Sequence, residues 1–169
     1  NPTLPEENFS FEDYLTEGIS HASEYIKEQL NSANIHYVGY CLGGTLTAMY
    51  LGSLEHKVQA SSATLLATLT DFTDAGQSAA FFDEKFSKQL ALAFSEQSYI
   101  AGNFYHFGFR WLRANHLIWP QYISRYFLNK PLIQFDILYW NCDSTNMPKD
   151  MFSEYIQTCY VERGFADGK

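Results

Sequence analysis

One cysteine in this sequence stands among glycines at a spacing that suits nucleophilic chemistry. The run Gly39-Tyr40-Cys41-Leu42-Gly43 has the G-x-S-x-G pattern of a nucleophile elbow, with a thiol in place of the hydroxyl. Such a turn lifts the side chain off the end of a strand, and glycines two residues to either side remove Cβ atoms that would clash with the turn and the neighbouring strand. The pattern therefore predicts a side chain that attacks an ester or thioester carbonyl.

The helix expected after the cysteine would support this chemistry. Its N-terminal end favours a thiolate at Cys41, and the backbone N–H of Leu42 would point to the place where a tetrahedral oxyanion forms. Gly44 extends the glycine run of the elbow. The alternative is that Cys41 fills space in a strand-to-helix turn, because cysteine is commonly buried. The strand expected before it and the helix expected after it favour the nucleophile.

A nucleophile of this kind needs a base and an orienting acid. We expect each histidine to be a surface or packed imidazole: His21, His36, His56, His106 and His116. His36 lies in the strand that leads to Cys41, well below the turn. Asp71 ends the next predicted strand, where a parallel sheet presents functional groups, but a turn or cap role is the favoured interpretation. The catalytic machinery is therefore incomplete in these residues.

The elements that must position the cysteine follow from hydrophobic spacing. Ser10, with an acidic residue three positions later, predicts the start of a helix that runs to residue 30. Residues 35–40 predict a buried strand, the apolar repeat at 46–54 an amphipathic helix, and residues 63–69 a second strand. Helix, strand, helix, strand with short connections is typical of a parallel α/β sheet.

The chain changes character after residue 80. Most of its 14 Phe, 12 Tyr and 3 Trp residues lie beyond that point, in helical runs at 83–94, 99–115 and 121–128. We expect residues 1–75 to be part of an α/β core that holds the elbow. Residues 76–169 are expected to form a mostly helical, aromatic-rich cap and a return segment.

Charge and cysteine content narrow the classes of function. A formal net charge of -8 argues against nucleic acid or an anionic membrane as partner. Three cysteines without an apolar leader argue against a secreted disulfide framework and for a cytoplasmic location, with Cys142 and Cys159 as ordinary buried or semi-buried thiols. No apolar run approaches the roughly 18 residues that a membrane span needs.

Four runs together resemble the polyhydroxyalkanoate synthases: GYCLGGTL, ATLTDFTDAG, LRANHLIW and FDILYWNCDSTNMP. The matches follow in order from about Phe11 to Glu162, and the block from Phe135 to Pro148 is the most specific. This resemblance implies a partial α/β-hydrolase fold, with a parallel sheet and nucleophile elbow, plus a mostly helical cap. It also implies polymerisation of 3-hydroxyacyl-coenzyme A, with the acyl group and growing polyester on Cys41 and coenzyme A leaving. The elbow resembles most the class I synthases, which take short-chain substrates such as 3-hydroxybutyryl-coenzyme A.

The resemblance also implies what lies elsewhere. The family's catalytic aspartate and histidine would follow Lys169, Asp136 and Asp143 would be structural, and upstream strands with a second oxyanion donor would be missing. We therefore expect an internal fragment that is inactive alone. No cofactor or metal is expected, and the implied partners are the thioester, the polyester, its granule surface and a second copy bound through the cap. Two positions differ from the family's usual sequence. His116 stands where the family usually has an aspartate, and the CYVERGF run around Cys159 differs from the usual end of its block.

Two other functions share some of these features. A cysteine-dependent α/β hydrolase of small esters or lactones would have the elbow and the fold, but would not be expected to contain FDILYWNCDSTNMP. A non-catalytic protein that binds a polyester or lipid surface would use the aromatic-rich segment, although a packed core is the ordinary role of such residues. The Cys41→Ala substitution separates these functions, because it removes acyl transfer and leaves surface binding intact.

Overall fold

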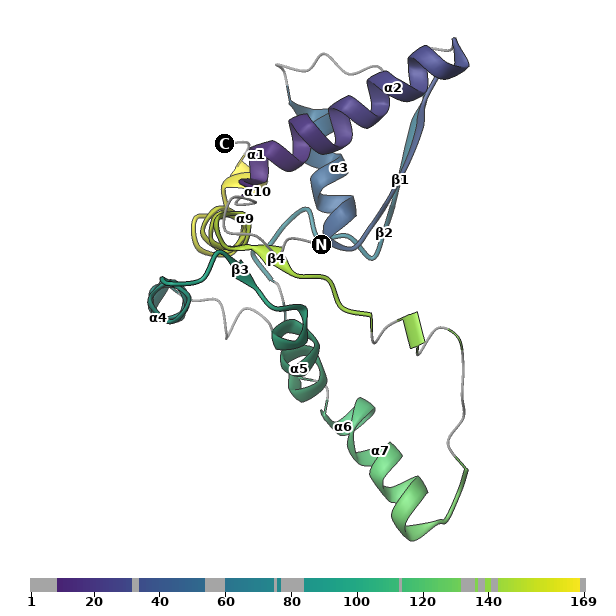
Figure 1. Cartoon of the computed structure of the whole chain (residues 1–169), viewed down its shortest axis with the longest axis vertical. Helices are drawn as coiled ribbons and strands as arrows, with labels where there is room; N and C mark the ends of the chain where they lie inside the picture. The colour runs from purple at the N-terminus through teal and green to yellow at the C-terminus, as the bar shows by residue number, and fades with distance from the viewer. Residues whose placement is uncertain are drawn as a thin grey trace.

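A computed structural model describes residues 9–31, 34–53, 60–74, 76, 84–112, 114–131, 136, 139–140 and 143–167. Its first part alternates helix and strand, and its second part is mainly helical. Figure 1 shows that the last helices of the chain, α9 and α10, lie beside the first helix, α1, while α5, α6 and α7 extend away from them as an arm. None of the helices in the described parts is long and apolar enough to cross a lipid bilayer.

Three consecutive segments form the first helical stretch: α1 (Phe11–Asp13), the π-helical η1 (Tyr14–Ser20) and α2 (His21–Leu30). Ser10 caps it as predicted, because its hydroxyl and N–H both donate to the Asp13 carboxylate and the Asp13 N–H donates back to the Ser10 hydroxyl. Asn31, in the left-handed conformation with φ 46°, ends it. The predicted apolar face is buried only at its start, where Leu15 is in the core, whereas Leu30 is 71% exposed.

Two parallel strands and the helix between them position the cysteine. Strand β1 (His36–Tyr40) pairs with β2 (Ser62–Leu66), and α3 (Leu42–Gly52) connects them. The parallel arrangement confirms the prediction, although β2 ends earlier than expected, before Ala67 with its φ of 48°. The expectation that the strand before Cys41 is buried is wrong for β1, since Gly39 is its only buried residue, and β2 is exposed throughout. Parallel strands become buried when helices cover both faces of the sheet, and the described residues do not provide this cover.

Helix α3 differs from the amphipathic helix that its spacing predicted. It contains no charged residue and is apolar on all sides. The reason lies in its surroundings, because α3 contacts β1, β2 and η1 and contributes Leu46 and Tyr50 to the main core. Leu15 from η1 and Met151 from α9 (Lys149–Tyr155) complete that core. Each such buried side chain stabilises the fold by about 1.5–3 kcal/mol.

The second half of the described chain is helical, as predicted, with one unpredicted strand pair. Its helices before the return segment are α4 (Glu84–Ala93), α5 (Gly102–Leu112), α6 (Ala114–Leu117), α7 (Trp119–Tyr122) and the π-helical η3 (Ile123–Phe127). The predicted run at 99–115 begins instead with β3 (Tyr99–Ile100), which pairs antiparallel with β4 (Met147–Pro148). After β4 the chain forms α9, the π-helical η4 (Ile156–Val161) and α10 (Gly164–Asp167). The division near residue 75 stays a prediction.

Candidate active site

Cys41 occupies a strained turn between β1 and α3. Its backbone has φ 53° and ψ -123°, a conformation that side-chain-bearing residues rarely adopt and that costs about 1–3 kcal/mol. Hydrogen bonds on both sides hold the turn. The Cys41 N–H donates to the carbonyl of Leu66 at 2.9 Å, and the Cys41 carbonyl accepts the N–H groups of Gly44 at 2.9 Å and Thr45 at 3.2 Å. Strain of this kind persists where surrounding structure fixes it, which is common at functional sites.

The thiol is exposed at the point where α3 begins. Cys41 is the N-cap residue of this helix, so the helix dipole favours negative charge at its side chain. Leu42 is the first helical residue, and its N–H is one of those that an α-helix leaves without an internal acceptor. The Leu42 side chain packs against the main core, which holds this N–H in place. The arrangement can therefore offer a thiolate and one oxyanion donor side by side.

Two of the three elbow glycines are required by close contacts. A Cβ on Gly39 would lie 2.5 Å from the Cα of Gly44, and a Cβ on Gly44 would lie 1.8 Å from the Oγ1 of Thr68. Strand, helix and the loop after β2 therefore touch through these two positions. The expectation for Gly43 is not met within the described residues, because a Cβ there would have none of their atoms within 4 Å. Gly44, rather than Gly43, is therefore the second elbow position at which a side chain would clash.

Threonines that the sequence analysis did not single out tie α3 to the loop after β2. The Thr45 side chain, 1% exposed, donates from Oγ1 to the carbonyl of Leu69 at 2.7 Å. Thr68 donates from Oγ1 to the carbonyl of Leu66 at 3.2 Å, the same carbonyl that accepts the Cys41 N–H. A signal for Thr45 was present in the sequence, because it is one of two threonines near the start of a helix without charged residues. These bonds fix the elbow against its neighbouring strand.

The described histidines lie at the far end of β1 or on other elements than those that hold the thiol. His36 bonds through Nδ1 to the hydroxyl of Ser62 at 2.7 Å, at the end of β1 opposite Cys41. His21 pairs with Glu17 at 3.1 Å on an exposed face of the first helical stretch. His106 lies in α5 and His116 in α6, both in the arm, and His56 lies outside the described residues. That none of them serves as the base stays a prediction.

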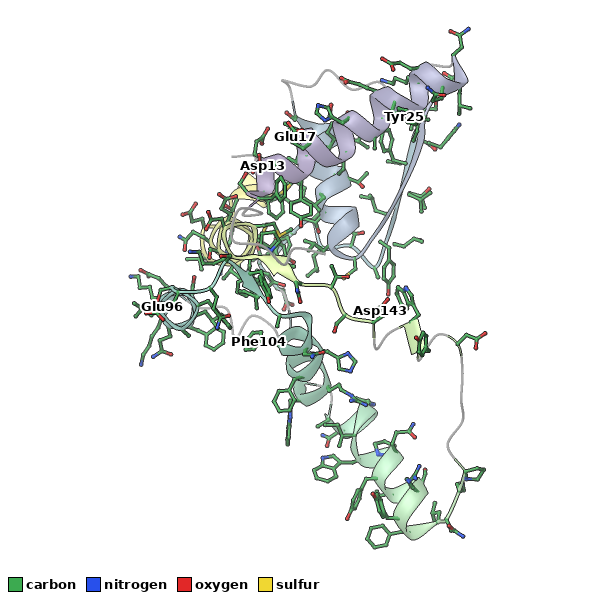
Figure 2. All side chains as sticks on the ribbon, viewed as in Figure 1. Asp13, Glu17, Tyr25, Glu96, Phe104 and Asp143 are labelled. Atoms are coloured by element: carbon green, nitrogen blue, oxygen red, sulfur yellow. The ribbon has the colours of Figure 1, made fainter. Side chains whose placement is uncertain are left out.

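The aspartates considered from the sequence are exposed. The Thr73 N–H donates to Oδ1 of Asp71 at 2.8 Å. Hydrogen bonds from the Thr73 side chain and from this N–H hold the pKa of Asp71 below its usual value. A carboxylate that accepts the N–H two residues later is typical of a turn, which is the role that the sequence favoured for Asp71. Asp136 is exposed, and Asp143 lies on the segment that returns from the arm (Figure 2).

Two half-buried phenols of the return segment, Tyr155 in α9 and Tyr160 in η4, were missed. The rings of Tyr155 and Tyr160 lie 5.6 Å apart at 90°, and burial raises the pKa of both. Hydrophobic spacing gave no signal for them, because tyrosine is common throughout the chain.

The other thiols differ from Cys41. Cys159 is fully buried at 0% exposure, as predicted, and burial raises its pKa to about 11. Cys142 lies outside the described residues. Within the described residues no group of His, Cys, Asp and Glu side chains could hold a metal ion.

Residues 2–157 match the family described as the alpha/beta hydrolase fold. The chain belongs to this family. The expected fold class is therefore confirmed, and the β1–Cys41–α3 unit has the strand, turn and helix order that the G-x-S-x-G pattern requires.

The alpha/beta hydrolase chain is similar to several curated proteins. It is 36% identical over 171 residues to "Poly(3-hydroxyalkanoate) polymerase subunit PhaC" of Rhizobium meliloti (strain 1021), a match that covers 100% of this chain and 28% of that protein. It is also 36% identical, with the same coverage, to "Poly(3-hydroxyalkanoate) polymerase" of Methylorubrum extorquens. The PhaC subunit of Cupriavidus necator is 29% identical over 96% of the chain and 29% of that protein. The chain thus spans less than a third of the length of these relatives.

Proposed function

We propose that this chain is the nucleophile-bearing segment of a poly(3-hydroxyalkanoate) polymerase, and that Cys41 carries the acyl group. The observation that carries the proposal is the exposed thiol at a strained strand-to-helix turn, beside the first N–H of α3. The polymerase names of relatives matched over the whole chain support the choice of reaction. The short-chain substrate 3-hydroxybutyryl-coenzyme A is part of the proposal.

The chemistry proceeds by acyl transfer. The Cys41 thiolate attacks the thioester carbonyl carbon, and the oxyanion that forms is stabilised by the Leu42 N–H. The bond to coenzyme A sulfur then breaks, so coenzyme A leaves as a thiolate and takes up a proton. The acyl group is now a thioester of Cys41. Attack on it by the hydroxyl of another 3-hydroxyacyl group forms an ester bond and releases Cys41, while the hydroxyl proton passes to a base.

The base and its orienting aspartate are proposed to lie in parts of a longer protein outside this chain, here called the parent protein. The short span of this chain relative to its relatives supports this proposal. No cofactor takes part, because the thioester is already activated. The parent protein is proposed to act in the cytoplasm, at the surface of its polyester granules.

Exposed aromatic side chains favour an interface on the arm. They occur along α5, α7 and η3, at Phe107, Trp111, Trp119, Tyr126 and Phe127. We propose that this face packs against a second copy in a homodimer, since exposed apolar patches mark interaction sites. Replacing Phe107 and Trp111 with Glu should convert a dimeric parent protein into a monomer in light scattering, and a dimer that persists would argue against this interface.

Radiolabelled 3-hydroxybutyryl-coenzyme A tests the acyl-enzyme in the parent protein. Cys41→Ala should abolish labelling, and Cys41→Ser should lower activity by orders of magnitude, because a hydroxyl needs far more help from a base. The matched control Cys159→Ala should keep the label. Labelling that survives Cys41→Ala but not Cys159→Ala would refute the elbow proposal. Release of the free acid without polymer would favour the cysteine-dependent hydrolase instead.

A further inference from the structure

The arm carries a charge of opposite sign to that of the whole chain. Between Glu96 and Asp136 the sequence contains no acidic residue, although the chain has 19 of them and a formal net charge of -8. The same run contains four of the 11 Lys and Arg residues: Arg110, Arg113, Arg125 and Lys130. The arm is therefore the cationic part of an acidic protein.

Three of these cations are among the described residues, and all three are exposed. Arg110 is in the last turn of α5, Arg125 is in η3, and Lys130 follows η3. In the part of the chain that the structure describes, none of the three forms an ion pair, whereas Lys88 of α4 pairs with Glu84 at 2.6 Å. Their charges are therefore available to an anionic group that comes from outside the chain.

The other described cations have acidic neighbours. Each of them is next to an acidic residue in the sequence or pairs with one: Lys27, Lys85, Lys88, Lys149 and Arg163. A neighbouring carboxylate cancels most of the field of such a cation at the distance of a Debye length. Among the described residues, the arm is thus the region where positive charge is not cancelled locally.

The position of the arm suits a ligand that extends away from Cys41. Strands β1 and β2 finish and α3 starts on the side of the core from which the arm extends (Figure 1). The thioester proposed above is such a ligand, because a long pantetheine chain separates its carbonyl from a nucleotide with a diphosphate and a 3′-phosphate. The nucleotide must therefore bind at a distance from the thiol.

Charge decides which part of the protein suits this nucleotide. An acidic surface repels phosphate groups, whereas a region of opposite sign raises the local concentration of an anionic ligand and its rate of association. Arginine is well suited to the contact, because its planar guanidinium can donate two parallel hydrogen bonds to one phosphate. The two described arginines of the arm meet both requirements.

We propose that Arg110 and Arg125 bind the phosphate groups of the coenzyme A part of the thioester. This inference rests on the proposed function and adds to it a subsite for the nucleotide. The arm then takes part in capturing the substrate as well as in the interface proposed for its aromatic face.

Two thioesters of the same acid test this subsite in the parent protein. Rapid-quench measurements at low ionic strength give the second-order rate of Cys41 acylation by 3-hydroxybutyryl-coenzyme A and by 3-hydroxybutyryl-pantetheine, which has the same reacting atoms and no phosphate. The double variant Arg110→Gln/Arg125→Gln is compared with the control Lys27→Gln/Lys85→Gln, which removes two positive charges outside the arm. The ratio of the two rates does not depend on the fraction of protein that is folded, so partial misfolding cannot imitate the result.

We expect the arm variant to lower the ratio of the coenzyme A rate to the pantetheine rate about tenfold, the effect of losing one hydrogen bond to a charged group. The control should keep the wild-type ratio. Added salt should lower the ratio in the wild type more than in the arm variant, because it screens the attraction that the variant has already lost.

A wild-type ratio in the arm variant, or an equal fall in the control, would overturn the inference while the proposed function stands. If the ratio is kept and light scattering shows that the arm variant has lost its dimer, the two arginines bind the second copy instead, and the inference is again overturned. A wild-type parent protein that acylates Cys41 with neither thioester would refute the proposed function, and this inference with it.

Discussion

The adjacent glycines at the start of α3 should respond in opposite ways to the same substitution. A Cβ on Gly44 would lie 1.8 Å from Oγ1 of Thr68 and 2.8 Å from its Cβ and Cγ2, whereas a Cβ on Gly43 would have no described atom within 4 Å. Gly44→Ala therefore forces Thr68 and its loop away from α3. That loop follows directly on Leu66, the last residue of β2, whose carbonyl accepts both the Thr68 hydroxyl and the Cys41 N–H, so the elbow is disturbed as well.

The expected magnitudes follow from overpacking and from backbone entropy. Forcing an extra methyl group into a packed contact costs about 1–3 kcal/mol, so Gly44→Ala should lower the free energy of unfolding by that amount. Gly43→Ala meets no such contact and should stabilise the helix by about 0.5–1 kcal/mol. Thr68→Ala removes two of the three clashing atoms of Thr68. Combined with Gly44→Ala, it should recover most of the lost stability.

Urea unfolding of the parent protein, followed by tryptophan fluorescence, measures these differences, and Cys41 acylation reports on the elbow. Gly44→Ala should unfold at lower urea than the wild type and acylate more slowly, while Gly43→Ala should do neither. The reasoning would be refuted if the two variants were equally stable. It would also be refuted if Thr68→Ala gave no recovery in the double variant, since the clash would then not involve that side chain.

Three further predictions concern buried groups and the chain alone. Iodoacetamide at pH 8 should alkylate Cys41 and spare Cys159, which mass spectrometry measures. Because the folded state raises the Cys159 pKa from 9.0 to about 11, the free energy of unfolding should fall as the pH rises between these values, and denaturation at pH 8 and pH 11 checks this. Thr45→Val deprives the Leu69 carbonyl of its donor and should cost about 1–3 kcal/mol in urea unfolding. The 169-residue chain alone should aggregate in gel filtration, because within the described residues β1 and β2 form a two-stranded sheet with open edges, and it should release no coenzyme A. A monodisperse, cooperatively melting chain, or sustained release of coenzyme A, would contradict this prediction.

The elements that could be predicted from the sequence are those that local signals decide. Ser10 and Asp13 form the predicted capping box, because both partners lie within one turn. The run before Cys41 forms a strand and the run after it a helix, because the glycines permit a turn that few other residues allow. The parallel pairing of β1 and β2 follows from the helix that must cross between them.

Features that depend on contacts between distant residues could not be predicted from the sequence. Spacing could not tell Gly43 from Gly44, because the difference is the position of Thr68 on a later segment. The return helix α9 was not predicted, although Phe152, Ile156 and Cys159 recur at helical spacing. The Tyr155–Tyr160 pair was beyond prediction, because it depends on a π-helical turn that no spacing rule identifies.

The short pairing of β3 with β4 has a consequence for how the arm can vary. The Lys149 N–H donates to the carbonyl of Ser98 at 3.0 Å, and the Gly102 N–H donates to Oδ1 of Asn146 at 3.0 Å, so the segment from 101 to 146 starts and ends at one clamp. Lengthening a loop whose ends are already fixed is inexpensive, about 0.6 kcal/mol for each doubling. The arm can therefore be exchanged as a unit. Replacing the segment from 101 to 146 with the corresponding segment of a relative should alter assembly and leave the geometry around Cys41 unchanged.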